Sequence, residues 1–140
     1  MPRDENVRRI RSAVTRLSRR LRAERPADAL AATKIAVLAE LWRNGRMCAG
    51  DLASLLRVQP QSLTRTLAAL EEDGLILRRP DELDRRQAVI GITEAGVTAL
   101  SEDMQARELW LAKAMDIQLS PAERQLLADA AELMDRLADD

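Results

Sequence analysis

Apolar residues recur at steps of three and four along several stretches of the chain, which is the spacing of amphipathic helices. The first such stretch runs from Val7 to Leu21 and predicts an arginine-rich helix that ends near Arg22. Its apolar residues form one narrow stripe. So thin a stripe suits packing against partner helices better than lining the centre of a globule.

A second helix is expected from about Thr33 to Asn44, and Gly45 follows it at a position where glycine commonly ends a helix. The residues expected on its apolar face are Ile35, Leu38, Leu41 and Trp42. The next three residues, Arg46 to Cys48, are short enough to be either a connector or a minimal third strand.

The following stretch predicts two short helices joined by a tight turn. Asp51 opens the first helix, and Val58 sits in the turn. Pro60 fits the first position of the second helix, where its missing N–H costs nothing. That helix spans about residues 60–73 and is closed by Gly74. Its core-facing residues, spaced three and four apart, are Leu63, Leu67 and Leu70.

Two strand patterns come next. Side chains alternate along residues 75–79, and the β-branched residues Val89, Ile90 and Ile92 form a partner strand. The connection from Pro80 to Arg86 is too long for a two-residue hairpin and too polar to be buried. It is therefore expected to project as a wing.

Two further helices are expected at the C-terminal end. Thr93 can cap a long helix that begins at Glu94. The segment from Ser120 to Glu123 then combines a serine N-cap, a proline at the first helical position and a glutamate at the third, which is the pattern of a capping box.

These elements predict a mainly α (α+β) fold, a winged helix-turn-helix whose N- and C-terminal helices form a dimerisation layer. The expected segments are 1–32 for the N-terminal helix and linker, 33–96 for the DNA-binding domain and 97–140 for the C-terminal helices. A compact winged helix cannot cover the stripes of the terminal helices. We therefore expect a two-fold homodimer, with a monomeric helical bundle as the alternative. The residues expected at the dimer interface are Ile10, Val14, Leu17, Leu21, Leu111, Met115, Leu126, Leu133 and Leu137.

Charge is distributed unevenly along the 140 residues. Residues 1–24 hold eight arginines and three acidic residues, whereas residues 101–140 hold four basic and ten acidic residues. The formal net charge of −1 therefore says nothing against a nucleic-acid partner, because a basic face matters more than the sum. The basic segment either contacts phosphates or is a solvated helix face.

Composition excludes several classes of function. The chain has no histidine and one cysteine, Cys48, so the commonest general base is missing and neither a disulfide nor a multi-cysteine zinc site can form within it. The acidic run at residues 71–73 is accompanied by no glycine-rich phosphate loop. We expect no catalysis, no metal and no cofactor. Two tryptophans are the only aromatic residues, which disfavours stacking on single-stranded nucleic acid.

The sequence lacks an apolar stretch of membrane-spanning length and the apolar region of a secretory signal. A cytoplasmic protein with no membrane partner is expected.

The second helix of the helix-turn-helix has the chemistry of a reader of double-stranded DNA. Residues near the N-terminus of such a helix reach base edges in the major groove. The guanidinium of Arg65 can donate two hydrogen bonds to guanine, and the amide of Gln61 can pair with adenine. The hydroxyls of Ser62 and Thr64 are suited to contacts with phosphate. The alternative to DNA contact is that these residues are only the exposed polar face of an amphipathic helix. The residues expected to contact DNA are Gln59, Pro60, Gln61, Ser62, Thr64, Arg65, Asp84, Arg85 and Arg86.

An arginine on the wing can enter the minor groove, where narrow A·T tracts concentrate negative potential. Two adjacent arginines behind Asp84 suggest that the aspartate holds one and the other inserts. We favour Arg86 over Arg85 as the inserted side chain. The competing interpretation is a surface salt-bridge cluster of the wing acids and arginines, which would contribute little to stability.

The runs TKIAVLAELWRNG and DLASLLRVQPQSLTRTLAALEEDGLILRRPDELDRRQAVIGITEAG resemble the MarR family of bacterial transcriptional regulators. The wing signature of that family is similar to Asp84-Arg85-Arg86 followed by the strand that ends in ITEAG. The resemblance covers roughly Thr33 to Gly96. It implies a homodimer that binds palindromic operators, usually as a repressor, with Gln61 and Arg65 at base-reading positions and Arg86 as the minor-groove arginine. Gln59 departs from the pattern as a poor N-cap.

The same resemblance raises the question of a signal, because many relatives respond to a small aromatic acid and others to cysteine oxidation. A pocket for a small aromatic or anionic effector can be lined by Trp42, Trp110, Met47 and nearby arginines. These residues fit ordinary core and surface equally well, and Cys48 fits a semi-buried hydrophobe. No effector is assigned.

The main alternative function is a winged helix that serves as an architectural or protein-interaction module with non-specific DNA binding. Arg65 and Arg86 would then be dispensable for any sequence preference.

Overall fold

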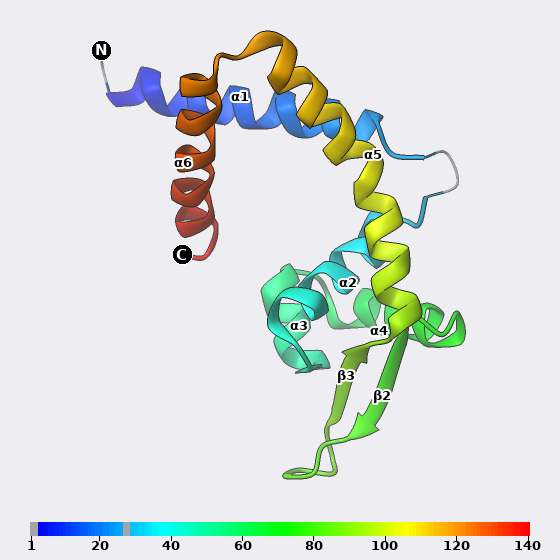
Figure 1. Cartoon of the computed structure of the whole chain (residues 1–140). Coiled ribbons are helices and arrows are strands. Elements are labelled where there is room, and N and C mark those ends of the chain that lie inside the picture. The colour runs from blue at the N-terminus through cyan, green and yellow to red at the C-terminus, as the bar shows by residue number, and fades with distance from the viewer. Residues whose placement is uncertain (1–2, 27–28) are drawn as a thin grey trace. The chain divides into compact units, whose positions relative to one another are not determined.

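The computed structural model describes residues 3–26 and 29–140, which contain six helices and three strands (Figure 1). Residues 1, 2, 27 and 28, part of the N-terminal segment expected at 1–32, lie outside the described residues. The chain divides into two compact units, one of Pro26–Gln105 and one of Met1–Arg25 with Ala106–Asp140. Among the described residues, none of the helices has the length and apolar character that a membrane crossing requires.

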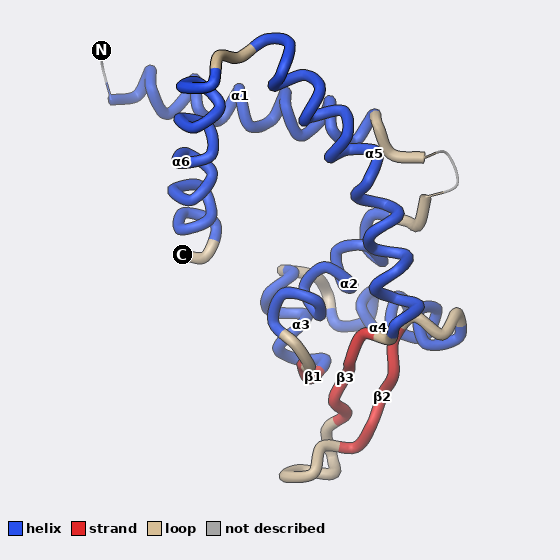
Figure 2. Tube along the Cα trace, in the orientation of Figure 1, coloured by secondary structure: helices blue, strands red, loops and turns tan. Residues whose placement is uncertain are grey.

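The unit of residues 26–105 is a winged helix-turn-helix, as the sequence predicts. In chain order it contains α2 (Ala32–Asn44), β1 (Met47–Cys48), α3 (Ala49–Leu56), α4 (Pro60–Glu72), β2 (Ile76–Pro80), β3 (Ala88–Ile92) and the first part of α5 (Glu94–Gln118). The strands form an antiparallel sheet in the order β1-β3-β2. Figure 2 shows β2 and β3 as a hairpin that extends beyond the helices and ends in a loop.

Strand β1 resolves one of the alternatives that the sequence leaves open. Met47 pairs with Ile90 and Cys48 with Val89, so this segment is a minimal third strand and not a connector. The pairing also moves the start of α3. Cys48 is the N-cap, the helix begins at Ala49, and Asp51 lies in its first turn. The expectation that Asp51 opens this helix is therefore wrong by two residues.

The core of this unit is aliphatic and is built from α2, α3, α4, the sheet and the start of α5. Its largest fully buried side chains are Leu38, Leu41, Leu52, Leu67, Leu70, Ile76, Ile90 and Val37. Trp42 was expected on the buried face of α2, but it is 62% exposed, and Val37 is buried instead. The buried face of α2 therefore includes the side of Val37, and Trp42, in the last turn of the helix, is not part of it.

A hydrogen-bonded junction closes the unit around Thr93. Its Oγ1 donates to the Gly74 carbonyl oxygen at 2.7 Å and accepts from the Gly96 N–H at 3.1 Å, which caps α5 as expected. The Thr93 N–H donates to the Leu75 carbonyl oxygen at 3.1 Å. The end of the α4 segment, the start of β2, the end of β3 and the start of α5 therefore meet at one point.

The second unit contains α1 (Arg3–Ala23), the later part of α5 and α6 (Pro121–Ala138). The Arg20 guanidinium lies over the Trp110 ring, 4.5 Å from its centroid, and forms an ion pair with Glu24. The expected capping box begins α6, with both Ser120–Glu123 hydrogen bonds formed. The hydrogen bond from the Ser120 backbone N–H, and then that with its side chain, lowers the pKa of the Glu123 carboxyl.

The close approach at Gly96 gives a first prediction. A Cβ on this residue would overlap the Leu75 carbonyl oxygen and lie 2.7 Å from Ile92 Cγ1. Gly96→Ala should therefore lower the free energy of unfolding by roughly 1–3 kcal/mol, measured by urea denaturation. The control is Gly50→Ala in α3, where a Cβ meets nothing within 4 Å and a gain of about 0.4–1 kcal/mol is expected. Equal effects of the two substitutions would contradict the packing at the junction.

Candidate nucleic-acid interface

Helix α4 is fixed on the body of the unit by one apolar face. Leu63, Leu67 and Leu70 are 4%, 1% and 0% exposed. The opposite face is open, and Gln61 and Arg65 lie on it, exposed to solvent. The polar side chains expected to read base edges are therefore brought together on the accessible side of the helix.

The start of α4 agrees with the sequence in detail. Pro60 is the first helical residue, and the N-cap Gln59 has extended backbone angles but makes no side-chain capping hydrogen bond. The first N–H groups of α4 are thus not occupied by a side chain of the N-cap residue. Such groups, together with the positive end of the helix dipole, are suited to an anion such as a phosphate.

The two hydroxyl residues expected at phosphates differ in their surroundings. Thr64 Oγ1 donates to the Pro60 carbonyl oxygen at 2.9 Å, so its proton is already used within the helix. Ser62 is exposed and lines a cavity of about 100 Å³ together with Thr33 and Thr66. Thr64 can accept a hydrogen bond in this rotamer, but it must rotate before it can donate to a phosphate.

The turn before α4 contains a residue that the sequence analysis missed. Arg57 has φ 54° and ψ 45°, the left-handed conformation, and its N–H donates to the Ala53 and Ser54 carbonyl oxygens at the end of α3. This side chain lines the same groove as Pro60 and Thr64. The sequence gives no signal for this conformation, because the turn lacks the glycine or asparagine that usually marks a residue of positive φ.

The wing loop, residues 81–87, is shaped by two aspartates. Asp81 Oδ1 accepts from the Leu83 N–H at 3.0 Å, and Asp84 Oδ1 accepts from the Arg86 N–H at 3.1 Å. Backbone hydrogen bonds from Asp81 to Gln87 and from Gln87 to Asp84, both 3.0 Å, close the loop. Because each carboxylate binds a backbone N–H two residues ahead, the loop is ordered without a hydrophobic core of its own.

Asp84 also holds the side chain of Arg86. Its Oδ1 accepts from Arg86 Nε at 3.2 Å, while the Arg86 side chain remains 93% exposed. The hydrogen bond at Nε thus orients the guanidinium, and its two terminal nitrogens remain accessible to a ligand. The sequence analysis expected Asp84 to hold one arginine and the other, Arg86, to insert. This expectation is wrong about the arginine that is held, because Asp84 contacts Arg86 itself. A cluster that includes Asp81 and Glu82 is not formed within the described part of the chain, where Asp84–Arg86 is the ion pair of the wing.

The residues expected at a dimer interface lie in the other unit and are largely open. Neither α1 nor α6 has a buried residue. On α1, Ile10, Val14 and Leu17 are 55%, 42% and 41% exposed, and Leu21 is half-buried. On α6, Leu126, Leu133 and Leu137 are 70%, 52% and 75% exposed, whereas Leu111 and Met115 of α5 are half-buried.

The residues considered for an effector pocket belong to two different units of the chain. Trp42 is exposed on α2, and the Trp110 ring is covered by Arg20 in the other unit. Met47 packs against the core of the winged helix, and Cys48 is a half-buried free thiol. In residues 3–26 and 29–140, His, Cys, Asp and Glu side chains form no group of three that could hold a metal ion.

Comparison with known proteins agrees with this geometry. The MarR family model matches residues 30–88. An HTH-type transcriptional regulator of Mycobacterium tuberculosis is 37% identical over 128 residues, which cover 91% of this chain and 89% of that protein. The crystal structure of a protein assigned as a transcriptional regulator in Pseudomonas aeruginosa is 33% identical, with a TM-score of 0.82 and 99% of each chain covered.

A second relative is the transcriptional activatory protein BadR of Rhodopseudomonas palustris, which is 40% identical over 74 residues, 50% of this chain and 42% of BadR. The family match, the near full-length similarity and the shared fold confirm the resemblance seen in the sequence. The chain belongs to the MarR family of transcriptional regulators, with a winged helix-turn-helix that binds DNA.

Proposed function

We propose that the protein is a sequence-specific regulator that binds a palindromic operator as a homodimer, with α4 in the major groove and the wing loop in the minor groove. The observation that carries this proposal is the pair of open arginines on two ordered elements of one unit. Arg65 lies on the exposed face of α4, and Arg86 is held at Nε by Asp84 on the wing loop. The first suits guanine in the major groove and the second a narrow minor groove.

The open stripes of the terminal helices support the homodimer. In one copy, α1 and α6 expose apolar side chains along their length and bury none. Burial of such surface is favourable by about 25 cal/mol per Å², and a second copy presents the same stripes. A monomeric helical bundle would bury these residues within one chain. A two-fold dimer also matches the symmetry of a palindrome.

Repression is the simplest consequence of such binding, because a dimer on an operator blocks access to the DNA that it covers. BadR is named as an activatory protein, so the sign of regulation depends on where the operator lies. Release of DNA by a small aromatic or anionic effector is a further part of the proposal and has no assigned site.

Substitution of the two arginines tests the proposal. Arg65→Ala should weaken binding to a selected operator by roughly 1–3 kcal/mol and relax the base preference at one position of each half-site. Arg86→Ala should weaken binding most on operators with flanking A·T tracts. Fluorescence anisotropy on matched and altered duplexes measures both effects. Arg136→Ala, on the exposed face of α6, is the control and should bind like the wild type. Equal losses for all three variants would instead support the architectural module.

The contact between Asp84 and Arg86 can be tested by a substitution for which the charge effect and the positioning effect predict opposite changes in DNA affinity. Asp84→Ala removes a negative charge near DNA, which alone would strengthen binding. Loss of the contacts to the Arg86 N–H and Nε should outweigh this effect and weaken binding by roughly three- to tenfold. Glu82→Gln removes a charge from the same loop without touching Arg86 and should leave binding unchanged or slightly tighter. If Asp84→Ala also tightened binding, Asp84 would have no positioning role.

The dimer is tested by placing charge in the exposed stripes. Leu17→Asp combined with Leu133→Asp should convert the protein to a monomer in sedimentation or light-scattering measurements, because burying an unpaired carboxylate costs several kcal/mol. Leu83→Asp is the control, since this wing residue is 98% exposed and lies outside the stripes. Circular dichroism verifies that the helices persist. A double variant with the wild-type mass in solution would contradict an interface formed by these helices.

A further inference from the structure

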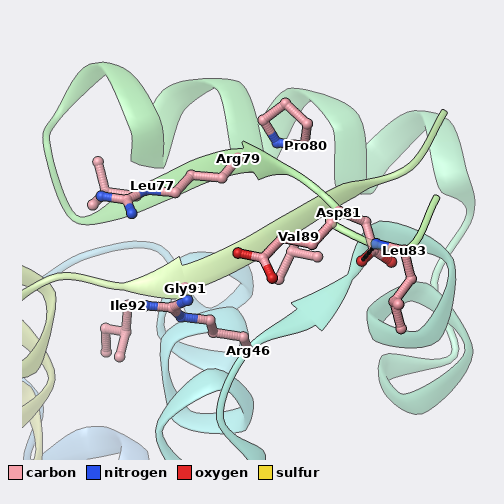
Figure 3. Close-up of a pocket in the computed structure, with 10 residues that line it drawn as sticks. Arg46, Leu77, Arg79, Pro80, Asp81, Leu83, Val89, Gly91 and Ile92 are labelled. Atoms are coloured by element: carbon pink, nitrogen blue, oxygen red, sulfur yellow. Dashed lines mark hydrogen bonds between the residues drawn. The ribbon is translucent and has the colours of Figure 1, made fainter. Parts of the chain in front are cut away.

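Leu83 lies in the wing loop and is almost fully open to solvent. It is 98% exposed, more than any other large apolar residue in the described part of the chain. Figure 3 shows it beside Asp81 at one end of the hairpin, with Leu77 and Ile92 at the other end. Single exposed apolar residues are common on protein surfaces. This one is distinguished by its position in the loop that we propose to enter the minor groove.

The wing loop holds Leu83 and Arg86 by the same type of hydrogen bond. Asp81 Oδ1 accepts from the Leu83 N–H at 3.0 Å, and Asp84 Oδ1 accepts from the Arg86 N–H at 3.1 Å. In both cases a carboxylate binds the backbone N–H two residues ahead. The Arg86 side chain is 93% exposed, so it is nearly as open as Leu83. The loop therefore presents one apolar and one cationic side chain from a backbone that is ordered at both positions.

The minor groove of DNA offers an apolar surface that matches Leu83. Deoxyribose rings form the walls of this groove, and an aliphatic side chain can contact their C–H groups. Proteins that bind the minor groove often combine arginine with an apolar residue, leucine among them. Contact with the sugars removes apolar surface from water and is favourable in proportion to the area buried. Such a contact carries no charge, so it releases no counterions from the DNA.

We propose that Leu83 enters the minor groove together with Arg86 and packs against the sugar rings of its walls. This inference rests on the proposed function, which places the wing loop in that groove. It assigns the affinity of the wing to two side chains that act differently. The contribution of Arg86 is electrostatic and falls as salt rises, whereas that of Leu83 is apolar and does not. The two contributions can therefore be separated by the salt dependence of binding.

Fluorescence anisotropy on a selected operator at several salt concentrations tests the role of Leu83. Leu83→Ala should weaken binding by roughly five- to tenfold at every salt concentration, because the apolar contact is lost. The slope of log K against log[salt] should stay at the wild-type value. Arg86→Ala should instead reduce the magnitude of that slope by about 1, since it removes one cation from the DNA.

Two further variants separate the apolar contact from a general effect on the hairpin. Leu83→Met keeps an apolar side chain of similar size and should bind within about twofold of the wild type. Leu77→Ala is the matched control, because Leu77 is 51% exposed on β2 of the same hairpin but lies outside the loop. It should bind like the wild type. On an operator shortened so that the base pairs beneath the wings are missing, Leu83→Ala and the wild type should bind equally.

Wild-type affinity of Leu83→Ala on the full operator would overturn the proposal. A reduction of the salt slope equal to that of Arg86→Ala, or an equal loss for Leu77→Ala, would also do so. Circular dichroism of each variant separates a loss of binding from a loss of fold. If Arg65→Ala and Arg86→Ala weaken operator binding while Leu83→Ala does not, this inference fails and the proposed function stands. If no palindrome is selected, the proposed function fails, and the same comparison on an unselected duplex still decides whether Leu83 contacts DNA.

Discussion

Burial of one leucine face on α4 determines where the side chains that we propose to read DNA can lie. Leu63, Leu67 and Leu70 enter a core formed with α2, α3 and the sheet, and all three are at most 4% exposed. Rotation of the helix about its axis would expose these residues, at roughly 1.5–3 kcal/mol for each leucine. The helix is therefore held in one orientation, and Gln61 and Arg65 must project from its open face. The base reading that we propose for this helix thus depends on hydrophobic packing on its opposite side.

The wing, the second element that we propose to contact DNA, is tied to the same body through the junction at Thr93. Strand β2 begins shortly after α4, and Thr93 joins the end of β3 to Gly74 and Leu75 at the start of β2. The wing loop at the far end of the hairpin is ordered by Asp81 and Asp84 rather than by apolar packing. Hydrogen bonds within the wing loop thus hold Arg86 in place. The packing of α4 against the core determines the position of Arg65. Both belong to one compact unit. In the proposed complex, the separation between the major-groove and minor-groove contacts is therefore set within each subunit.

Much of this arrangement could be predicted from the sequence, because the signals are local. Pro60 and the Ser120 capping box mark helix starts within a few residues, and the leucine spacing of α4 identifies its buried face. The errors come from contacts between distant segments. Pairing of Cys48 with Val89 sets the start of α3, which a local pattern at Asp51 cannot show. The exposure of Trp42, in the last turn of α2, depends on which other segments pack there, which the spacing of apolar residues does not show. The Asp84–Arg86 contact and the left-handed Arg57 depend on loop conformation, which hydrophobic periodicity does not describe.

The most direct test of this account is selection of bound sequences from a random duplex library at about 150 mM salt, where non-specific phosphate binding is weakened. We expect enrichment of one palindrome whose half-sites are centred about one helical turn apart, ~34–36 Å, with a fixed spacing set by the two-fold dimer. Retention of duplexes without a common motif, and with a steep dependence on salt, would contradict sequence-specific reading and leave binding to the phosphate backbone alone.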